Sequence, residues 1–77
     1  MTEYEAEIPR WRRVYETLRA RVESGEYPPD SRVPSIVQVA EEFGVAQVTA
    51  QKALAGLRAE GYTYTEPGIG SFVRGSK

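Results

Sequence analysis

Residues 34–61 read PSIVQVAEEFGVAQVTAQKALAGLRAEG, and the spacing of apolar side chains in this stretch predicts two consecutive helices. The first helix is predicted to follow Ser35 and to end at Gly44, and the second to run from near Ala46 to Gly61. In both, apolar residues recur three and four positions apart, which places them on one helix face. These positions are Ile36, Val39, Ala40 and Phe43 in the first helix, and Ala50, Ala53, Leu54 and Leu57 in the second.

Four residues decide how these helices begin and pack. Ser35 is a good N-cap, and with Gln38 three positions later it fits a capping box. Ala46 has no side-chain oxygen to accept the free N–H groups of the second helix, which costs about 1 kcal/mol. A bound phosphate oxygen could satisfy those groups, because helix N-termini attract anions. Gly56 in mid-helix costs about 1 kcal/mol relative to alanine, so we expect another helix to approach closely there.

The flanking segments complete one domain. Residues 62–73 read YTYTEPGIGSFV, where the period changes to two and a turn at 66–70 separates two strands. Residues 32–33 are predicted as a very short further strand. Before them, a helix opening at Pro9 and ending at Gly25 carries an amphipathic face. Its apolar positions are Trp11, Val14, Tyr15, Leu18 and Val22. The aromatic residues Trp11, Tyr15 and Phe43 are expected in the core rather than in a ligand cage.

This order of elements predicts an α+β fold: a winged helix-turn-helix with three helices and a two- or three-stranded β-wing. The domain is expected over residues 9–74, between a mobile acidic tail at 1–8 and a second tail at 75–77. The chain of 77 residues has no cysteine and no histidine, and no nucleophile is paired with a base. The sequence therefore predicts neither an enzyme, nor a metal site, nor a cofactor.

The sequence also bears on cellular location and charge. No apolar run approaches the roughly 20 residues that span a membrane, and no signal peptide opens the chain, so we expect a cytoplasmic protein without membrane contact. The net charge is −1 and the sequence pI is about 5.4, which argues weakly against non-specific binding to nucleic acid.

The chain resembles the winged helix-turn-helix domain of GntR-type bacterial transcription regulators. The matching signs, over residues 14–73, are SGEYPPDSRVPS after the first helix, VA-x-x-FGV at the turn, T-x-x-KAL-x-x-L-x-x-EG and G-x-GSFV. Each sign is weak alone, but their order and spacing are specific. The resemblance implies a regulator that binds double-stranded DNA as a homodimer on an inverted repeat. Most members carry a further effector-binding domain; within these 77 residues we expect no small-molecule effector site.

The chain departs from the family pattern at several positions that contact DNA in the family. Val37 stands where members usually have an arginine, and Ala46, Gln47 and Val48 replace a usual Ser-Arg-Thr. Gln51 replaces another arginine, and Ile69 stands between the wing glycines in place of a basic or polar residue. Neutral side chains thus replace several groups directed at phosphate and guanine.

The outward face of the second of these helices is the candidate reading surface. Its residues are Gln47, Val48, Thr49, Gln51 and Lys52. Glutamine can bind adenine in a bidentate manner, and valine can contact a thymine methyl, so the face suits an A·T-leaning half-site. Lys52 is a candidate phosphate or guanine contact. The alternative is a solvated helix face without a partner.

Further candidate DNA contacts lie elsewhere in the chain. Ser35 could present its helix N-terminus to a phosphate, or act only as an N-cap. The wing tip, Gly68, Ile69 and Gly70, could follow a minor groove or a backbone, or form a plain hairpin turn. The arginines at the start of the first helix, Arg10, Arg12 and Arg13, could supply phosphate charge, or form only a solvated face.

The function predicted is that of a small sequence-specific regulator, such as a repressor or a plasmid- or phage-like control protein working at the nucleoid. One alternative is a degenerate winged helix that binds another protein through Val48, Ile69 and exposed tyrosines. Another is the N-terminal fragment of a longer ligand-sensing regulator.

Overall fold

The computed structural model describes residues 8–74 and contains three helices and one β-hairpin. The two predicted tails therefore lie outside the described residues, apart from Ile8, which is exposed. The predicted α+β winged helix is confirmed, with a two-stranded sheet. The elements are α2 (Arg10–Ser24), α3 (Ile36–Phe43), α4 (Gln47–Ala59), β1 (Thr63–Glu66) and β2 (Gly70–Val73).

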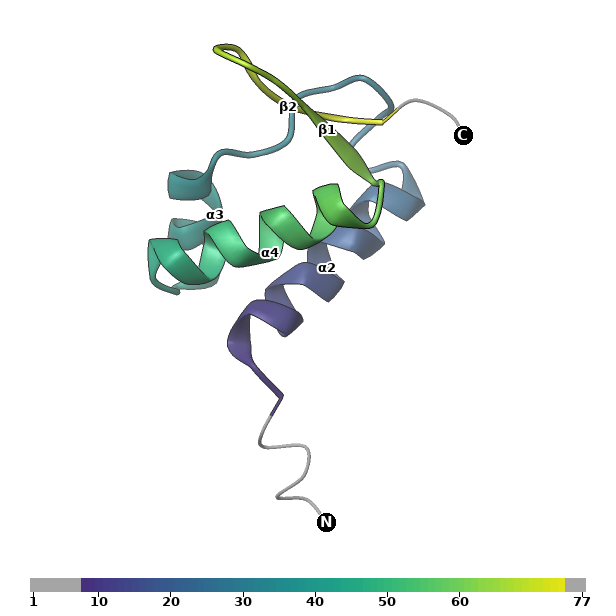
Figure 1. The fold of residues 1–77 in the computed structure, drawn as a ribbon. Helices are drawn as coiled ribbons and strands as arrows, with labels where there is room; N and C mark the ends of the chain where they lie inside the picture. The colour runs from purple at the N-terminus through teal and green to yellow at the C-terminus, as the bar shows by residue number, and fades with distance from the viewer. Residues whose placement is uncertain (1–7, 75–77) are drawn as a thin grey trace.

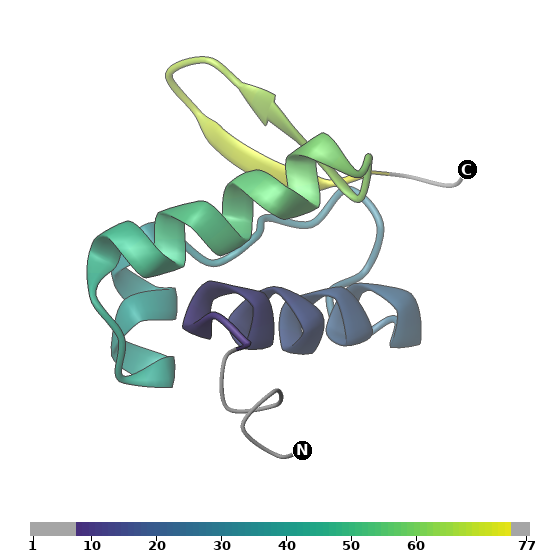
Figure 2. The same ribbon diagram turned by 60° about the horizontal axis from the view of Figure 1, so that its bottom comes forward.

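Helix α4 is the centre of the arrangement. Helix α2 lies along one side of α4, and the hairpin β1–β2 rises from the other side (Figures 1 and 2). Helix α3 lies beside the N-terminal end of α4. The N-terminal turns of α3 and α4 and the tip of the hairpin therefore lie toward the same end of the molecule.

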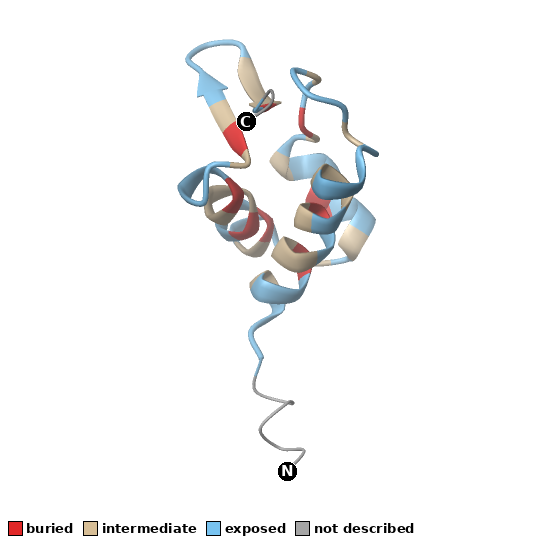
Figure 3. Ribbon diagram, turned by 90° about the vertical axis from the view of Figure 1, so that its right-hand side faces the viewer, coloured by how far each residue is buried: buried red, intermediate tan, exposed pale blue. Residues whose placement is uncertain are grey.

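The core fills the space between the three helices. Figure 3 shows buried residues on the sides of the helices that face one another. They are Val14 and Leu18 of α2, Val39 and Ala40 of α3, and Ala50, Ala53 and Leu57 of α4. The predicted inward faces are thus confirmed at their centres. Their outer members, among them Trp11, Tyr15, Phe43 and Leu54, are half-buried at the rim.

Both helix starts follow their local chemistry. The hydroxyl of Ser35 accepts a hydrogen bond from the Gln38 amide at 3.1 Å, and the Gln38 side chain accepts one from the Ser35 amide at 2.9 Å. The predicted capping box is confirmed. Ala46 is the N-cap of α4 and makes no side-chain capping bond, so the first turn of α4 begins without one.

Gly56 lies where α2 packs against α4, which confirms the predicted close approach. A Cβ atom on Gly56 would lie 3.1 Å from Cδ1 of Tyr15 and 3.7 Å from Cζ3 of Trp11. The missing side chain therefore lets the aromatic rings of α2 rest directly on the α4 backbone. This contact explains why the helix tolerates a residue of low helix propensity at its centre.

Gly56→Leu is expected to lower the free energy of unfolding by about 1–3 kcal/mol, because the added atoms must displace Tyr15 or Trp11. Gly56→Ala should change it far less, since the gain of about 1 kcal/mol in helix propensity offsets the crowding. Urea denaturation measures both, with Ala20→Leu at an exposed position of α2 as the control. A Gly56→Leu protein as stable as wild type would contradict the proposed packing.

The wing has a tight turn at its tip, and its strand β2 also pairs with the segment that precedes α3. The amide of Ile69 donates to the carbonyl of Glu66 at 2.9 Å, with Pro67 and Gly68 between them and Gly68 at φ +79°. Proline followed by a glycine of positive φ is the pattern of a type II turn. On the outer edge of β2, the predicted short strand is reduced to one bridge, between Arg32 and Phe72.

At its base the hairpin buries Thr63 and Val73 rather than its aromatic rings. Thr63 and Val73 are paired and buried, whereas Tyr64 and Phe72 stack on the other face with centroids 5.8 Å apart. Burial raises the pKa of the Tyr64 hydroxyl, and the nearby Asp30 carboxylate adds to the effect. Tyr62 packs against the core. Both tyrosines are half-buried, so neither offers a fully exposed ring to a partner.

Candidate nucleic-acid interface

The side of α4 opposite the core presents an almost uninterrupted set of exposed side chains. Gln47, Val48, Gln51 and Lys52 are all exposed, Val48 by 68%. They face outward because Ala50, Ala53 and Leu57 turn the opposite side of the helix into the core. Thr49 is half-buried, on the side that also carries Gly56, seven residues further along. Of the five predicted α4 positions, Thr49 is thus the least accessible.

A groove joins this face to the other two elements predicted to contact DNA. Its volume is about 280 Å³, and its lining includes Ser35 of α3, Gln51, Ala55 and Arg58 of α4, and Gly70 and Ser71 of β2. Ser35, Gln51 and Gly70, which are far apart in sequence, are therefore brought to one surface. Among them, only Arg58 carries a charge. Arg58 was not among the predicted site residues.

The wing tip is held by a second arginine that the sequence analysis did not single out. Arg32 donates a hydrogen bond to the carbonyl of Ile69, and its guanidinium lies 6.0 Å from the centre of the Phe72 ring. A Cβ atom on Gly70 would lie 2.8 Å from Nη2 of Arg32. Gly70 therefore makes room for Arg32, which holds the backbone at Ile69. Ile69 itself is 57% exposed at the tip.

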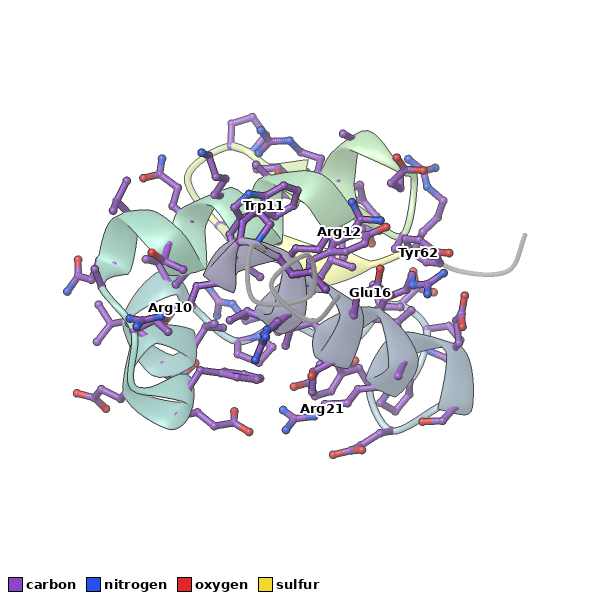
Figure 4. All side chains as sticks on the ribbon, turned by 90° about the horizontal axis from the view of Figure 1, so that it is seen from below. Arg10, Trp11, Arg12, Glu16, Arg21 and Tyr62 are labelled. Atoms are coloured by element: carbon purple, nitrogen blue, oxygen red, sulfur yellow. The ribbon has the colours of Figure 1, made fainter. Side chains whose placement is uncertain are left out.

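The three candidate arginines of α2 do not lie together. Arg10 and Arg13 line a shallow cavity beside the turn at residues 43–45, where α3 leads into α4. Arg12 points to the other side of α2, where its Nε lies 3.2 Å from a carboxylate oxygen of Glu16 (Figure 4). Arg10 and Arg13 are thus placed beside the helix-turn-helix, and Arg12 is not.

The remaining arginines of α2 stabilise the fold. Arg21 lies 2.6 Å from a carboxylate oxygen of Glu42 and donates to the Tyr27 hydroxyl at 2.8 Å, which ties α2 to α3. The hydrogen bond that Arg21 donates to the Glu42 carboxylate lowers the pKa of Glu42. Arg19 pairs with Glu16 at 2.6 Å within α2. The basic stretch of the first helix is therefore divided between arginines in ion pairs and arginines, Arg10 and Arg13, that form no ion pair with another residue of the range 8–74.

Within residues 8–74, no group of three or more His, Cys, Asp or Glu side chains could hold a metal ion. None of the helices in that range combines the length and the apolar character that crossing a bilayer requires.

Comparison with known proteins places this arrangement in a family. Residues 11–73 match the description "Bacterial regulatory proteins, gntR family". The HTH-type transcriptional repressor NagR of Bacillus subtilis is 38% identical over 66 residues, covering 86% of this chain and 27% of that protein. The histidine utilization repressor of Pseudomonas putida is 33% identical over 69 residues, covering 90% and 28%. The chain thus spans about a quarter of the length of these relatives.

Solved structures agree with the sequence comparison. The DNA-binding domain of AraR, solved in complex with its operator ORX1, superimposes with a TM-score of 0.82 at 30% identity, covering 90% of this chain and 83% of that one. The same domain in complex with operator ORR3 gives 0.79, covering 86% and 80%. The chain belongs to the gntR family of bacterial regulatory proteins and has the winged helix fold of that family's DNA-binding domains.

Proposed function

We propose that this domain binds double-stranded DNA in a sequence-specific manner and serves a transcription regulator, most simply a repressor, at the nucleoid in the cytoplasm. The N-terminal half of α4 enters the major groove, and the wing lies on the adjacent groove or backbone. One observation carries this proposal: the exposed face of α4, the capped start of α3 and the wing border the same groove.

The chemistry of the α4 face supports readout of bases more than general attraction to phosphate. Gln47 and Gln51 offer paired donors and acceptors that match the major-groove edge of adenine. Val48 offers an exposed apolar side chain to a thymine methyl. Lys52 adds one positive charge. The preferred half-site should therefore lean toward A·T pairs.

Selection of bound duplexes from a random pool tests the proposal directly. The resemblance to GntR-type regulators implies a homodimer on an inverted repeat, which would place two α4 helices in successive major grooves about 34–36 Å apart. The expected product is an A·T-leaning inverted repeat with half-sites about one turn apart. Failure to enrich any sequence, with no binding of mixed duplexes at low salt, would overturn the proposal.

Replacing thymine with deoxyuridine at the half-site is expected to weaken binding, because it removes only the methyl group that Val48 would contact. The expected loss is about threefold to tenfold at one position, since a methyl contact contributes on the order of 1 kcal/mol. Binding of Val48→Ala should be insensitive to the same replacement. Equal sensitivity of both proteins would show that the methyl is read elsewhere or not at all.

A second function has one observation in its favour. Val37, Val48 and Ile69 are exposed by 47%, 68% and 57%, and such apolar side chains also suit a protein partner. If the winged helix binds protein instead of DNA, its NMR spectrum should not change when mixed duplex is added at low salt. Changes in NMR signals confined to α4 and the wing would favour DNA binding.

A further inference from the structure

We propose that the groove between α4 and the wing is a seat for one sugar–phosphate strand of DNA, and that Arg58 is its phosphate-binding residue. The inference rests on the proposed function and assigns a role to a residue outside the predicted reading face. Its ligand is a phosphodiester of the strand that separates the two grooves.

The first step is geometric. In a duplex, a major groove and the neighbouring minor groove are separated by a single sugar–phosphate strand. If α4 occupies one groove and the wing tip reaches the next, that strand must pass between them. The groove lined by Gln51 and Ala55 on one side and by Gly70 and Ser71 on the other is the space between these two elements.

The second step concerns charge. Arg58 is seven residues beyond Gln51, so the two side chains lie on the same side of α4, about 10 Å apart along its axis. Arg58 is exposed and makes no ion pair with any residue from 8 to 74. A free guanidinium suits a phosphate, because its N–H groups match two phosphate oxygens.

The third step concerns shape. Ala55 and Gly70 are the smallest side chains of this lining, so they leave space for a bulky backbone between helix and wing. Arg32 holds the carbonyl of Ile69 and fixes the tip of the wing above the groove. The groove therefore has small residues, Ala55 and Gly70, on its helix and wing sides, and Arg58 supplies its positive charge.

The test is a salt titration of binding to the selected duplex and to an unrelated one, with wild type, R58Q and R58K. In R58Q, the slope of log K against log salt should become shallower by about 0.9 per protomer, since one phosphate contact is lost. Affinity should fall about threefold to tenfold at roughly 0.1 M salt, for both duplexes alike. R58K should keep the wild-type slope, because it keeps the charge.

The control is R74Q, which removes an equal charge at the far end of β2, where Arg74 donates to the carbonyl of Gly61. R74Q should retain the wild-type slope. A scan with single neutral methylphosphonates should find one position that weakens wild type but not R58Q. This scan reads the contact in the DNA, and circular dichroism verifies that R58Q remains folded.

The outcomes separate the two proposals. A wild-type protein that binds the duplex while R58Q keeps its slope, or loses base preference instead, overturns the role of Arg58 alone. A wild-type protein that binds no duplex overturns the proposed function and this inference with it.

Discussion

Gln51→Ala and Lys52→Ala are each expected to weaken binding to the selected duplex by about 1–3 kcal/mol, a rise in Kd of about 5- to 150-fold. Both side chains are exposed on α4, and Gln51 also lines the groove below the wing. Loss of Gln51 should relax base preference at one position of the half-site. If Lys52 contacts phosphate, its loss should weaken binding about equally for all DNA sequences and make the dependence of log K on log salt shallower.

Gln38→Ala is the matched control for Gln51→Ala. It removes the same side chain from the neighbouring helix, where it serves the capping box of Ser35. It should lower stability by about 1 kcal/mol and leave base preference unchanged. If Gln51→Ala and Lys52→Ala both retain full affinity and preference, α4 does not read DNA with this face.

The helices were predictable because their signals are local. The recurrence of apolar residues, the Ser35–Gln38 pair and the uncapped Ala46 each act within one or two turns, and the structure agrees with all three. The role of Gly56 was also within reach, since a glycine in mid-helix requires a compensating contact. The turn of the wing was predictable from Pro67 and Gly68, because a proline followed by a glycine is itself a local turn signal.

The candidate site depends on contacts that no local pattern reports. Arg32 reaches the carbonyl of a residue 37 positions away, and Ser35 and Arg58 border one groove only because α3, α4 and the wing fold together. The arginines of α2 show the same limit. Their sequence forms one basic stretch, but Arg21 closes an ion pair with α3 whereas Arg10 and Arg13 lie beside the turn.

This distribution of charge has a consequence for affinity. The first turn of α4 carries only neutral residues, so attraction to phosphate must come from dispersed cations such as Lys52, Arg58, Arg10 and Arg13. Each contact adds about 0.9 to the salt slope, and four per protomer would give a dimer a slope near −7. A much shallower slope would mean that fewer of these cations reach the DNA.

Leu57→Ala is expected to lower the free energy of unfolding by about 2–5 kcal/mol, because it leaves a cavity at a fully buried position of α4. A chain of 77 residues has a total stability of only about 4–12 kcal/mol, so this loss would leave a large unfolded fraction on warming. Urea denaturation followed by circular dichroism measures the change. Leu57→Met, which nearly conserves volume, should cost less than about 1.5 kcal/mol.

Adding DNA distinguishes the loss of stability in Leu57→Ala from a defect in DNA binding. A duplex that binds only the folded state adds about 2.7 kcal/mol of stability at a hundredfold excess over Kd. Leu57→Ala should therefore regain much of its fold, with unchanged base preference, when the selected duplex is in excess. Gln51→Ala should be folded without DNA and gain less from it. If duplex fails to raise the urea midpoint of Leu57→Ala while it raises that of wild type, the buried leucine also shapes the reading face of α4.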